Sequence, residues 1–244
     1  MIGKAVAALD AFLDDDQELT LTELATRLRM SRSTVHRLLA TLERHQLVDR
    51  TDNGAYRLGI HLFRLGSAVR VRAVLGGLAE APLTRLAERF AVSSYLSVRD
   101  ADRALCLLRI DRGPVIATTY QMGDTLSLHL GAGPITLLSS LPAADVTRIL
   151  AAPRIAMTPR TTVDPAAIRV RLATIRESGV AFAADDVQVG LAAMGVPVRD
   201  GSGAVIAAVS VVALTPWFTD DHSTAMADAL RQSAREIEDQ LSVP

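Results

Sequence analysis

The chain has few of the residues on which several classes of protein depend. It contains one cysteine, Cys106, among 244 residues, so neither an internal disulfide nor a cysteine-rich zinc site can form. Lys4 is the only lysine, which excludes a Walker-type phosphate loop and a catalytic lysine farther along the chain. No run of about 18 apolar residues is free of charge, and no apolar signal segment follows Met1. These absences predict a cytoplasmic protein without a membrane-spanning helix.

The net charge of −1 conceals an uneven distribution along a chain of globular composition, 49% hydrophobic and 22% charged. Residues 1–26 carry a charge of −5, residues 27–72 a charge of +7 and residues 73–244 a charge of −3. Such a basic segment is typical of a nucleic-acid-binding module joined to an acidic domain, but a solvated arginine-rich surface has the same charge. The length favours two domains.

Residues 20–44 have the pattern of a helix-turn-helix. Thr20 and Glu23 are spaced as a capping box, and apolar residues then recur at helical intervals. Ser31 is placed to cap a second helix, whose apolar stripe runs over residues 35–42. The side opposite that stripe carries short polar residues and two arginines: Ser33, Arg37, Ala40 and Arg44, flanked by Thr34, His36 and Thr41. Such a face suits a helix that lies in the major groove of DNA.

The next segment predicts a wing and a linker. Residues 47–58 form two strand-like runs around Asn53-Gly54, a strong hairpin signal, so with a helix over residues 5–13 we expect a winged helix-turn-helix over 1–58. The amphipathic stretch 60–72 is interpreted as a linker helix and a dimer seam, the alternative being that it packs on its own domain. Gly76-Gly77 should break this helix, which predicts a linker over 59–77 and a second domain over 78–244.

The second domain alternates strand-like and helical segments. Turn residues separate the strands, which favours an α+β domain with an antiparallel sheet over a parallel doubly wound one. We expect strands over 94–99, 104–110, 115–120, 189–198 and 204–214, and helices over 82–91, 134–141, 142–151, 164–178 and 220–241.

Three stretches resemble, in this order, the IclR family of bacterial transcriptional regulators. They read ELTLTELATRLRMSRSTVHRLLATLERHQLVDRTDNGAYRLGIHLFRLGSA, YQMGDTLSLHLGAGPITLLSSLP and RESGVAFAADDVQVGLAAMGVPVRDGSGAVIAAVSVVA. The resemblance covers nearly the whole chain and is most specific at SRSTVHRLLATLERHQLV. It implies a winged helix-turn-helix, a linker helix and a GAF-like domain that binds a small-molecule effector, in a homodimer or a dimer of dimers that binds an operator in double-stranded DNA.

The resemblance also implies which residues contact DNA. The readers on the recognition helix would be Arg32, Ser33, Thr34 and Arg37, on the face that the periodicity selects, with His36 and Arg44 beside them. Contacts to phosphate would come from Thr20, Thr22, Arg50 and Arg57, although Thr20 serves equally well as a helix cap alone.

The expected effector pocket departs from the family pattern. Family members usually have Gly-Lys or Gly-Arg at a helix start that can hold an anion, whereas this chain has Pro134 and Ile135 there. The position at which family members have an acidic residue corresponds to Ala183 or Ala184 here. The acidic residues of this chain are the next two, Asp185 and Asp186. We therefore expect a rather apolar or aromatic ligand in a pocket formed by Met122, Leu126, His129, Ala132, Gly133, Asp185, Ala193, Met194 and Ser210.

Catalysis has little support in the sequence, and no cofactor is expected. A nucleophile elbow and a His-Glu-x-x-His motif are both missing, and Cys106 is expected to be a buried, unreactive thiol. A zinc site at Asp221 and His222 is a minor alternative. Two other functions stay open: an enzyme with an appended DNA module, and an architectural DNA-binding protein whose second domain only oligomerises.

Overall fold

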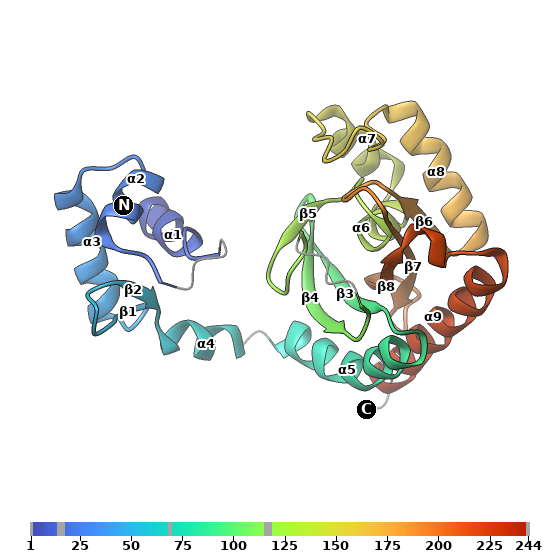
Figure 1. The fold of residues 1–244 in the computed structure, drawn as a ribbon, viewed down its shortest axis with the longest axis horizontal. Helices are drawn as coiled ribbons and strands as arrows, with labels where there is room; N and C mark the ends of the chain where they lie inside the picture. The colour runs from blue at the N-terminus through green and yellow to red at the C-terminus, as the bar shows by residue number, and fades with distance from the viewer. Residues whose placement is uncertain (1, 14–17, 68–69, 115–118, 243–244) are drawn as a thin grey trace. The chain divides into compact units, whose positions relative to one another are not determined.

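The computed structural model describes residues 2–13, 18–67, 70–114 and 119–242, without side chains for residues 67 and 70–73. The chain divides into two compact units, Met1–Ala73 and Val74–Pro244 (Figure 1). Among the described residues, no helix is both long and apolar enough to cross a membrane.

The first unit has the predicted winged helix-turn-helix. It contains α1 (Ile2–Asp10), α2 (Leu21–Arg27), α3 (Arg32–Arg44), β1 (Val48–Arg50), β2 (Tyr56–Leu58) and α4 (Ile60–Ser67). Helix α1 begins and ends three residues earlier than expected. Thr20 caps α2 in a reciprocal capping box and Ser31 caps α3, because each side chain accepts a backbone N–H that lacks a partner within the helix.

The core of this unit lies where α1, α2 and α3 meet. Leu24, Val35 and Leu39 are completely buried there, as the helical period predicts. The antiparallel hairpin of β1 and β2 closes through Asn53-Gly54, where Gly54 has φ +83°, a conformation that favours glycine. Tyr56 also pairs with Leu19, so the hairpin is attached to the helices by a backbone bridge.

A correction concerns α5 (Arg70–Phe90), which continues through Gly76, Gly77 and Pro82. The predicted break at the two glycines is therefore wrong, and the predicted helix over 82–91 is the second half of this longer one. A glycine within a helix costs only about 1 kcal/mol relative to alanine. Burial of Ala79 and Leu83 against the sheet of the second unit offsets that cost. The expected linker helix over 60–72 is divided between α4 and α5, and residues 68–69 lie outside the described part.

In the described residues of the second unit, six strands form one antiparallel sheet. The strand order is β5-β4-β3-β8-β7-β6, from β3 (Ser93–Asp100), β4 (Arg103–Asp111), β5 (Thr125–Ser127), β6 (Ala181–Ala184), β7 (Leu191–Arg199) and β8 (Val205–Leu214). This confirms the α+β prediction. Of the strand expected over 115–120, residues 115–118 lie outside the described part and Thr119-Tyr120 form a bend. The short strands β5 and β6 were not predicted.

Helices cover both faces of this sheet (Figure 1). Helices α5 and α9 (Asp220–Leu241) pack on one face over a core that includes Leu96, Val209 and Leu230. The other face carries α6 (Ala132–Ser139), with α7 (Ala143–Ala151) and α8 (Pro165–Ser178) packed beside it. Helix α6 lies so close to the sheet that a Cβ atom on Gly195 would be 3.1 Å from the carbonyl carbon of Ala132. Figure 1 shows α6 against this face of the sheet.

Candidate DNA interface and effector cavity

Helix α3 presents a polar and basic face to solvent. All six of its predicted DNA-contacting side chains are exposed: Arg32, Ser33, Thr34, His36, Arg37 and Arg44. The opposite stripe holds α3 on the core through Val35, Leu39 and Leu42, which are at most 4% exposed. The hydroxyl of Thr34 lies 2.8 Å from that of the capping residue Ser31, so it is held at the start of the helix. The fold therefore displays the face that the sequence selects.

The four predicted phosphate contacts are also exposed in this unit. Thr20 accepts a backbone hydrogen bond from Glu23 and donates one to its carboxylate, so its capping role occupies the hydroxyl. The backbone N–H of Thr20 and then its hydroxyl donate to the Glu23 carboxylate, and these two bonds hold the pKa of that carboxyl below its ordinary value. Thr22 lies in the first turn of the same helix, and Arg50 and Arg57 lie on the two wing strands.

A groove between α1 and α3 contains a basic residue that was not among the predicted DNA contacts. Lys4, the only lysine, lines this groove together with Thr34, Arg37 and Thr41. Nothing in the local sequence predicts this placement, because it depends on how α1 crosses α3.

The second unit contains a cavity of about 60 Å3 on the α6 face of the sheet. A water molecule occupies roughly 10–15 Å3 on this measure, so the space suits a small ligand. Five predicted pocket residues come together in its wall: Leu126, Ala132, Gly133, Ala193 and Ser210. The N-terminus of α6, the four adjacent strands β3, β8, β7 and β6, the loop 185–190 and residues 119–120 contribute the remaining wall, mostly apolar.

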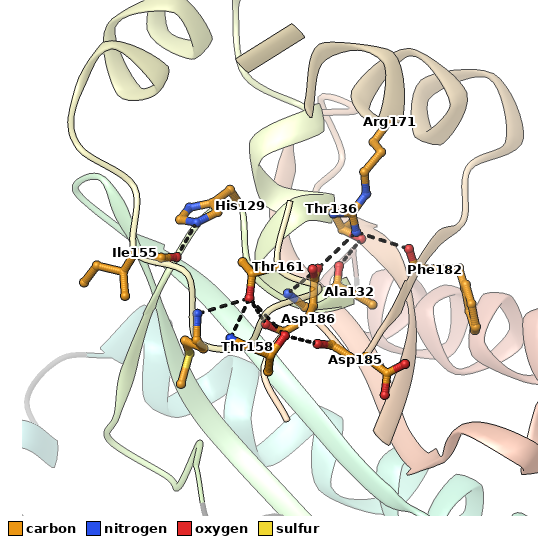
Figure 2. A network of polar contacts seen from close by, with 12 residues as sticks. His129, Ala132, Thr136, Ile155, Thr158, Thr161, Arg171, Phe182, Asp185 and Asp186 are labelled. Atoms are coloured by element: carbon orange, nitrogen blue, oxygen red, sulfur yellow. Dashed lines mark hydrogen bonds and ion pairs between the residues drawn. The ribbon is translucent and has the colours of Figure 1, made fainter. Parts of the chain in front are cut away.

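Four predicted pocket residues lie elsewhere, and these placements correct the prediction. Met122 is 67% exposed, in a turn. Met194 belongs to the core on the opposite face of the sheet, because side chains alternate along β7 and its neighbour Ala193 points to the cavity. His129 is buried outside the cavity, with Nε2 3.1 Å from the carbonyl oxygen of Ile155, and burial lowers its pKa (Figure 2). Asp185 forms an ion pair with Arg160 instead.

The wall also contains residues that the sequence argument missed, chiefly Tyr95, Tyr120, Asp186, Gln188, Leu191 and Val212. Ser210 and Val212 share a face of β8, so strand alternation was the available signal for that pair. Tyr95 is part of the cavity wall because strand β3 pairs with β8 and this pairing places Tyr95 opposite Ser210. No local sequence pattern specifies that register.

A hydrogen-bond network holds the loop that closes the cavity. Asp186 accepts a hydrogen bond from the backbone N–H of Gly131 at 3.3 Å and one from Arg171 at 3.2 Å (Figure 2). The hydroxyls of Thr158 and Thr161 donate to the carbonyl oxygens of Asp185 and Asp186, as Figure 2 shows. The carboxylate of Asp186 therefore already has partners at the start of α6, where a free anion would otherwise bind.

Two aromatic rings form one side of the cavity. Tyr95 and Tyr120 stack with ring centroids 6.0 Å apart and an interplanar angle of 17°. The hydroxyl of Tyr120 lies 3.2 Å from that of Ser97. The Tyr95 hydroxyl and the side-chain oxygen of Gln188 have no hydrogen-bond partner among the described residues.

Residues with catalytic or metal-binding potential are not gathered in the described ranges. Cys106 is buried, and burial raises its pKa to about 12, so its thiol stays protonated as expected. No group of three His, Cys, Asp or Glu side chains in the part that the structure describes is placed to hold a metal ion. Within this part, the ring of His222 stacks on Trp217 and its Nδ1 lies 2.9 Å from the Trp217 carbonyl oxygen.

The two units together define a class of protein: a helix-turn-helix DNA-binding unit joined to an antiparallel-sheet unit with an internal ligand cavity. The model of the IclR helix-turn-helix domain matches residues 2–52, and that of the bacterial transcriptional regulator IclR C-terminal domain matches residues 69–239. The chain belongs to the IclR family, whose members are ligand-responsive DNA-binding regulators.

Individual relatives agree with this assignment. The chain is 29% identical to the HTH-type transcriptional regulator XynR of Escherichia coli, over 100% of this chain and 97% of that protein. It is 32% identical to the HTH-type transcriptional regulator BhcR of Paracoccus denitrificans, over 95% and 86%. These relatives are named as regulators, which supports the expectation that the chain is not an enzyme and does not favour a purely architectural role.

A solved structure shares the fold over nearly the full length. An IclR homologue from Microbacterium hydrocarbonoxydans, crystallised with 4-hydroxybenzoate, superposes with a TM-score of 0.90 at 24% identity, over 98% of both chains.

Proposed function

We propose that this bacterial, cytoplasmic regulator binds a pseudo-palindromic operator as a homodimer or a dimer of dimers and presents one α3 helix to each half-site. The exposed face of α3 carries this proposal. Arg32, Ser33, Thr34, His36, Arg37 and Arg44 would face the bases, whereas Thr20, Thr22, Arg50 and Arg57 would position the unit on phosphates. We further propose a DNA-binding domain over 1–58, a linker over 59–77 and an effector domain over 78–244.

Exposed apolar side chains on α4 support dimerisation through the linker. Ile60, Phe63 and Leu65 are 63%, 72% and 52% exposed, a large apolar surface for one short helix. A second copy of the chain would bury them, as the dimer seam predicts.

Substitution of Arg37 tests the recognition surface. If Arg37 makes a bidentate contact to guanine, Arg37→Ala should weaken specific binding by about 1–3 kcal/mol. Arg235→Ala removes the same charge from an exposed position on α9 and should leave the affinity unchanged. Binding is measured by fluorescence anisotropy on the intergenic DNA upstream of the gene and on genomic fragments selected by the protein, each against scrambled DNA at two salt concentrations. Equal affinity of both variants for specific DNA would place Arg37 on a merely solvated face.

We also propose that the cavity takes a small, rather apolar or aromatic effector. Its aliphatic and aromatic wall supports this proposal, as does the 4-hydroxybenzoate in the Microbacterium homologue. Calorimetry should give tighter binding of phenylpyruvate-like or hydroxybenzoate-like compounds than of pyruvate or glyoxylate. The reverse order would contradict the proposal.

A further inference from the structure

Two residues that line the cavity each have a buried side-chain oxygen with no hydrogen-bond partner in the described part of the chain; the Ser93 hydroxyl next to Tyr95 donates to Asp111 instead. The two unpaired atoms are the hydroxyl oxygen of Tyr95, a residue that is 2% exposed, and the side-chain oxygen of Gln188. We propose that these residues determine ligand specificity by binding one hydroxyl group on a single-ring ligand, with Tyr95 donating to its oxygen and Gln188 accepting its proton. This inference rests on the proposed effector cavity.

An unpaired polar atom in a protein interior needs a physical reason. Most buried polar atoms have a partner, and a buried group without one destabilises the fold because it has lost its hydrogen bonds to water. Two other buried polar side chains of this wall have partners: Tyr120 lies beside the hydroxyl of Ser97, and Asp186 accepts from Gly131 and Arg171. Tyr95 and Gln188 differ from these two residues because their side-chain oxygens have unmet hydrogen-bonding capacity.

The chemistry of these two atoms selects the ligand group. Burial raises the pKa of Tyr95 to about 12, so its hydroxyl keeps the proton at neutral pH and can donate it. The oxygen of Gln188 only accepts. A ligand hydroxyl can accept from Tyr95 and donate to Gln188, whereas a carboxylate has no proton to donate and would leave Gln188 unpaired.

The rest of the wall favours a ring next to that hydroxyl. Leu126 and Val212 are apolar, and the stacked rings of Tyr95 and Tyr120 add an aromatic surface on the same side. The carboxylate of Asp186 is already paired with Arg171 and with the backbone N–H of Gly131 at the start of α6, so it does not need a partner from the ligand. Phenol is the simplest compound that meets these conditions.

Phenol and toluene are a matched pair of probes, because a methyl group replaces the hydroxyl with little change in shape. A merely apolar cavity would bind toluene more tightly than phenol, because transfer from water to an apolar environment is more favourable for toluene. For the full-length protein, calorimetry should show phenol binding at least about ten-fold tighter than toluene, because buried polar groups reject an analogue that cannot pair with them. Tyr95→Phe and Gln188→Leu should each remove most of this preference while leaving toluene affinity unchanged.

The stability of the ligand-free variants separates a binding role from a structural one. Tyr95→Phe removes an unpaired hydroxyl and should hold or raise the melting temperature, measured by the fluorescence of Trp217, the only tryptophan and a residue of this unit. Tyr120→Phe is the control, because it removes a partnered hydroxyl and should lower the melting temperature.

Two results would overturn the inference. One is the absence of a preference for phenol, either because toluene binds as well or because neither probe binds at millimolar concentration. The other is a Tyr95→Phe variant that melts earlier and binds phenol as the unmodified chain does. Neither result affects operator binding, which is measured separately with Arg37→Ala, so failure of the ligand assignment is distinguishable from failure of the regulator function.

Discussion

Replacing Gly195 with alanine should separate α6 from the sheet and distort the cavity. A Cβ atom at this position would lie 3.1 Å from the carbonyl carbon of Ala132, 3.2 Å from its oxygen and 3.2 Å from Cβ of Ser210. Two of these neighbours are backbone atoms at the start of α6, which cannot rotate away as a flexible side chain can. Overpacking of this kind lowers the free energy of unfolding by about 1–3 kcal/mol. Alanine has less conformational freedom than glycine in the unfolded chain, which raises the free energy of unfolding by about 0.4–1 kcal/mol.

Urea denaturation followed by Trp217 fluorescence measures this effect in the second unit alone, because the chain has no other tryptophan. We expect Gly195→Ala to lower the midpoint without changing the slope of the transition. Gly201→Ala is the matched control, since a Cβ atom there would have no described neighbour within 4 Å, and it should be neutral or slightly stabilising. A Gly195→Ala variant as stable as the Gly201→Ala variant would refute the close approach of α6 to β7.

Three further predictions concern the first unit, the linker and the cysteine. Thr20→Ala should destabilise the first unit by about 1 kcal/mol, because α2 loses its cap; circular dichroism of this unit would detect it, and an unchanged transition would contradict the capping role. Phe63→Glu should weaken self-association in light scattering, while Val170→Glu, at a similarly exposed apolar residue on α8, should not; the same mass for both variants would remove α4 from the dimer contact. Cys106, with its pKa raised to about 12 by burial, should resist alkylation at pH 8 in the native protein and react after denaturation, and rapid reaction of the native thiol would contradict its burial.

The elements predicted correctly are those that local chemistry specifies. The caps at Thr20 and Ser31 satisfy N–H groups of their own helices, and Asn53-Gly54 closes a hairpin with its own neighbours. In α5, by contrast, the local cost of Gly76-Gly77 is small and distant packing exceeds it, so the predicted break did not occur. Strands β5 and β6 have three and four residues, too few for a period to be visible.

The cavity was predicted less well because it depends on strand register. Strand β7 is buried on both faces, so its sequence does not reveal that Ala193 points to the cavity while Met194 points to the opposite core. Tyr95 is brought beside Ser210 only by the pairing of β3 with β8. Ala132 and Gly133 were placed through the resemblance to the IclR family, because they follow its Gly-Asp-x-Leu-x-Leu-His motif, and not through a local structural signal.

Side chains alternate between the two faces along a strand, so residues that line the cavity have direct neighbours in the core on the opposite face of the sheet. Tyr95 lines the cavity, whereas its neighbour Leu96 belongs to the core on which the second half of α5 packs. Ser210 and Val211 have the same relation on β8, which pairs directly with β3. A ligand that contacts Tyr95 therefore contacts a strand whose other side supports α5, the helix that starts in the linker. For such a ligand to change operator binding, its affinity must differ between two arrangements of α5, and operator DNA must then change the ligand's affinity by the same factor.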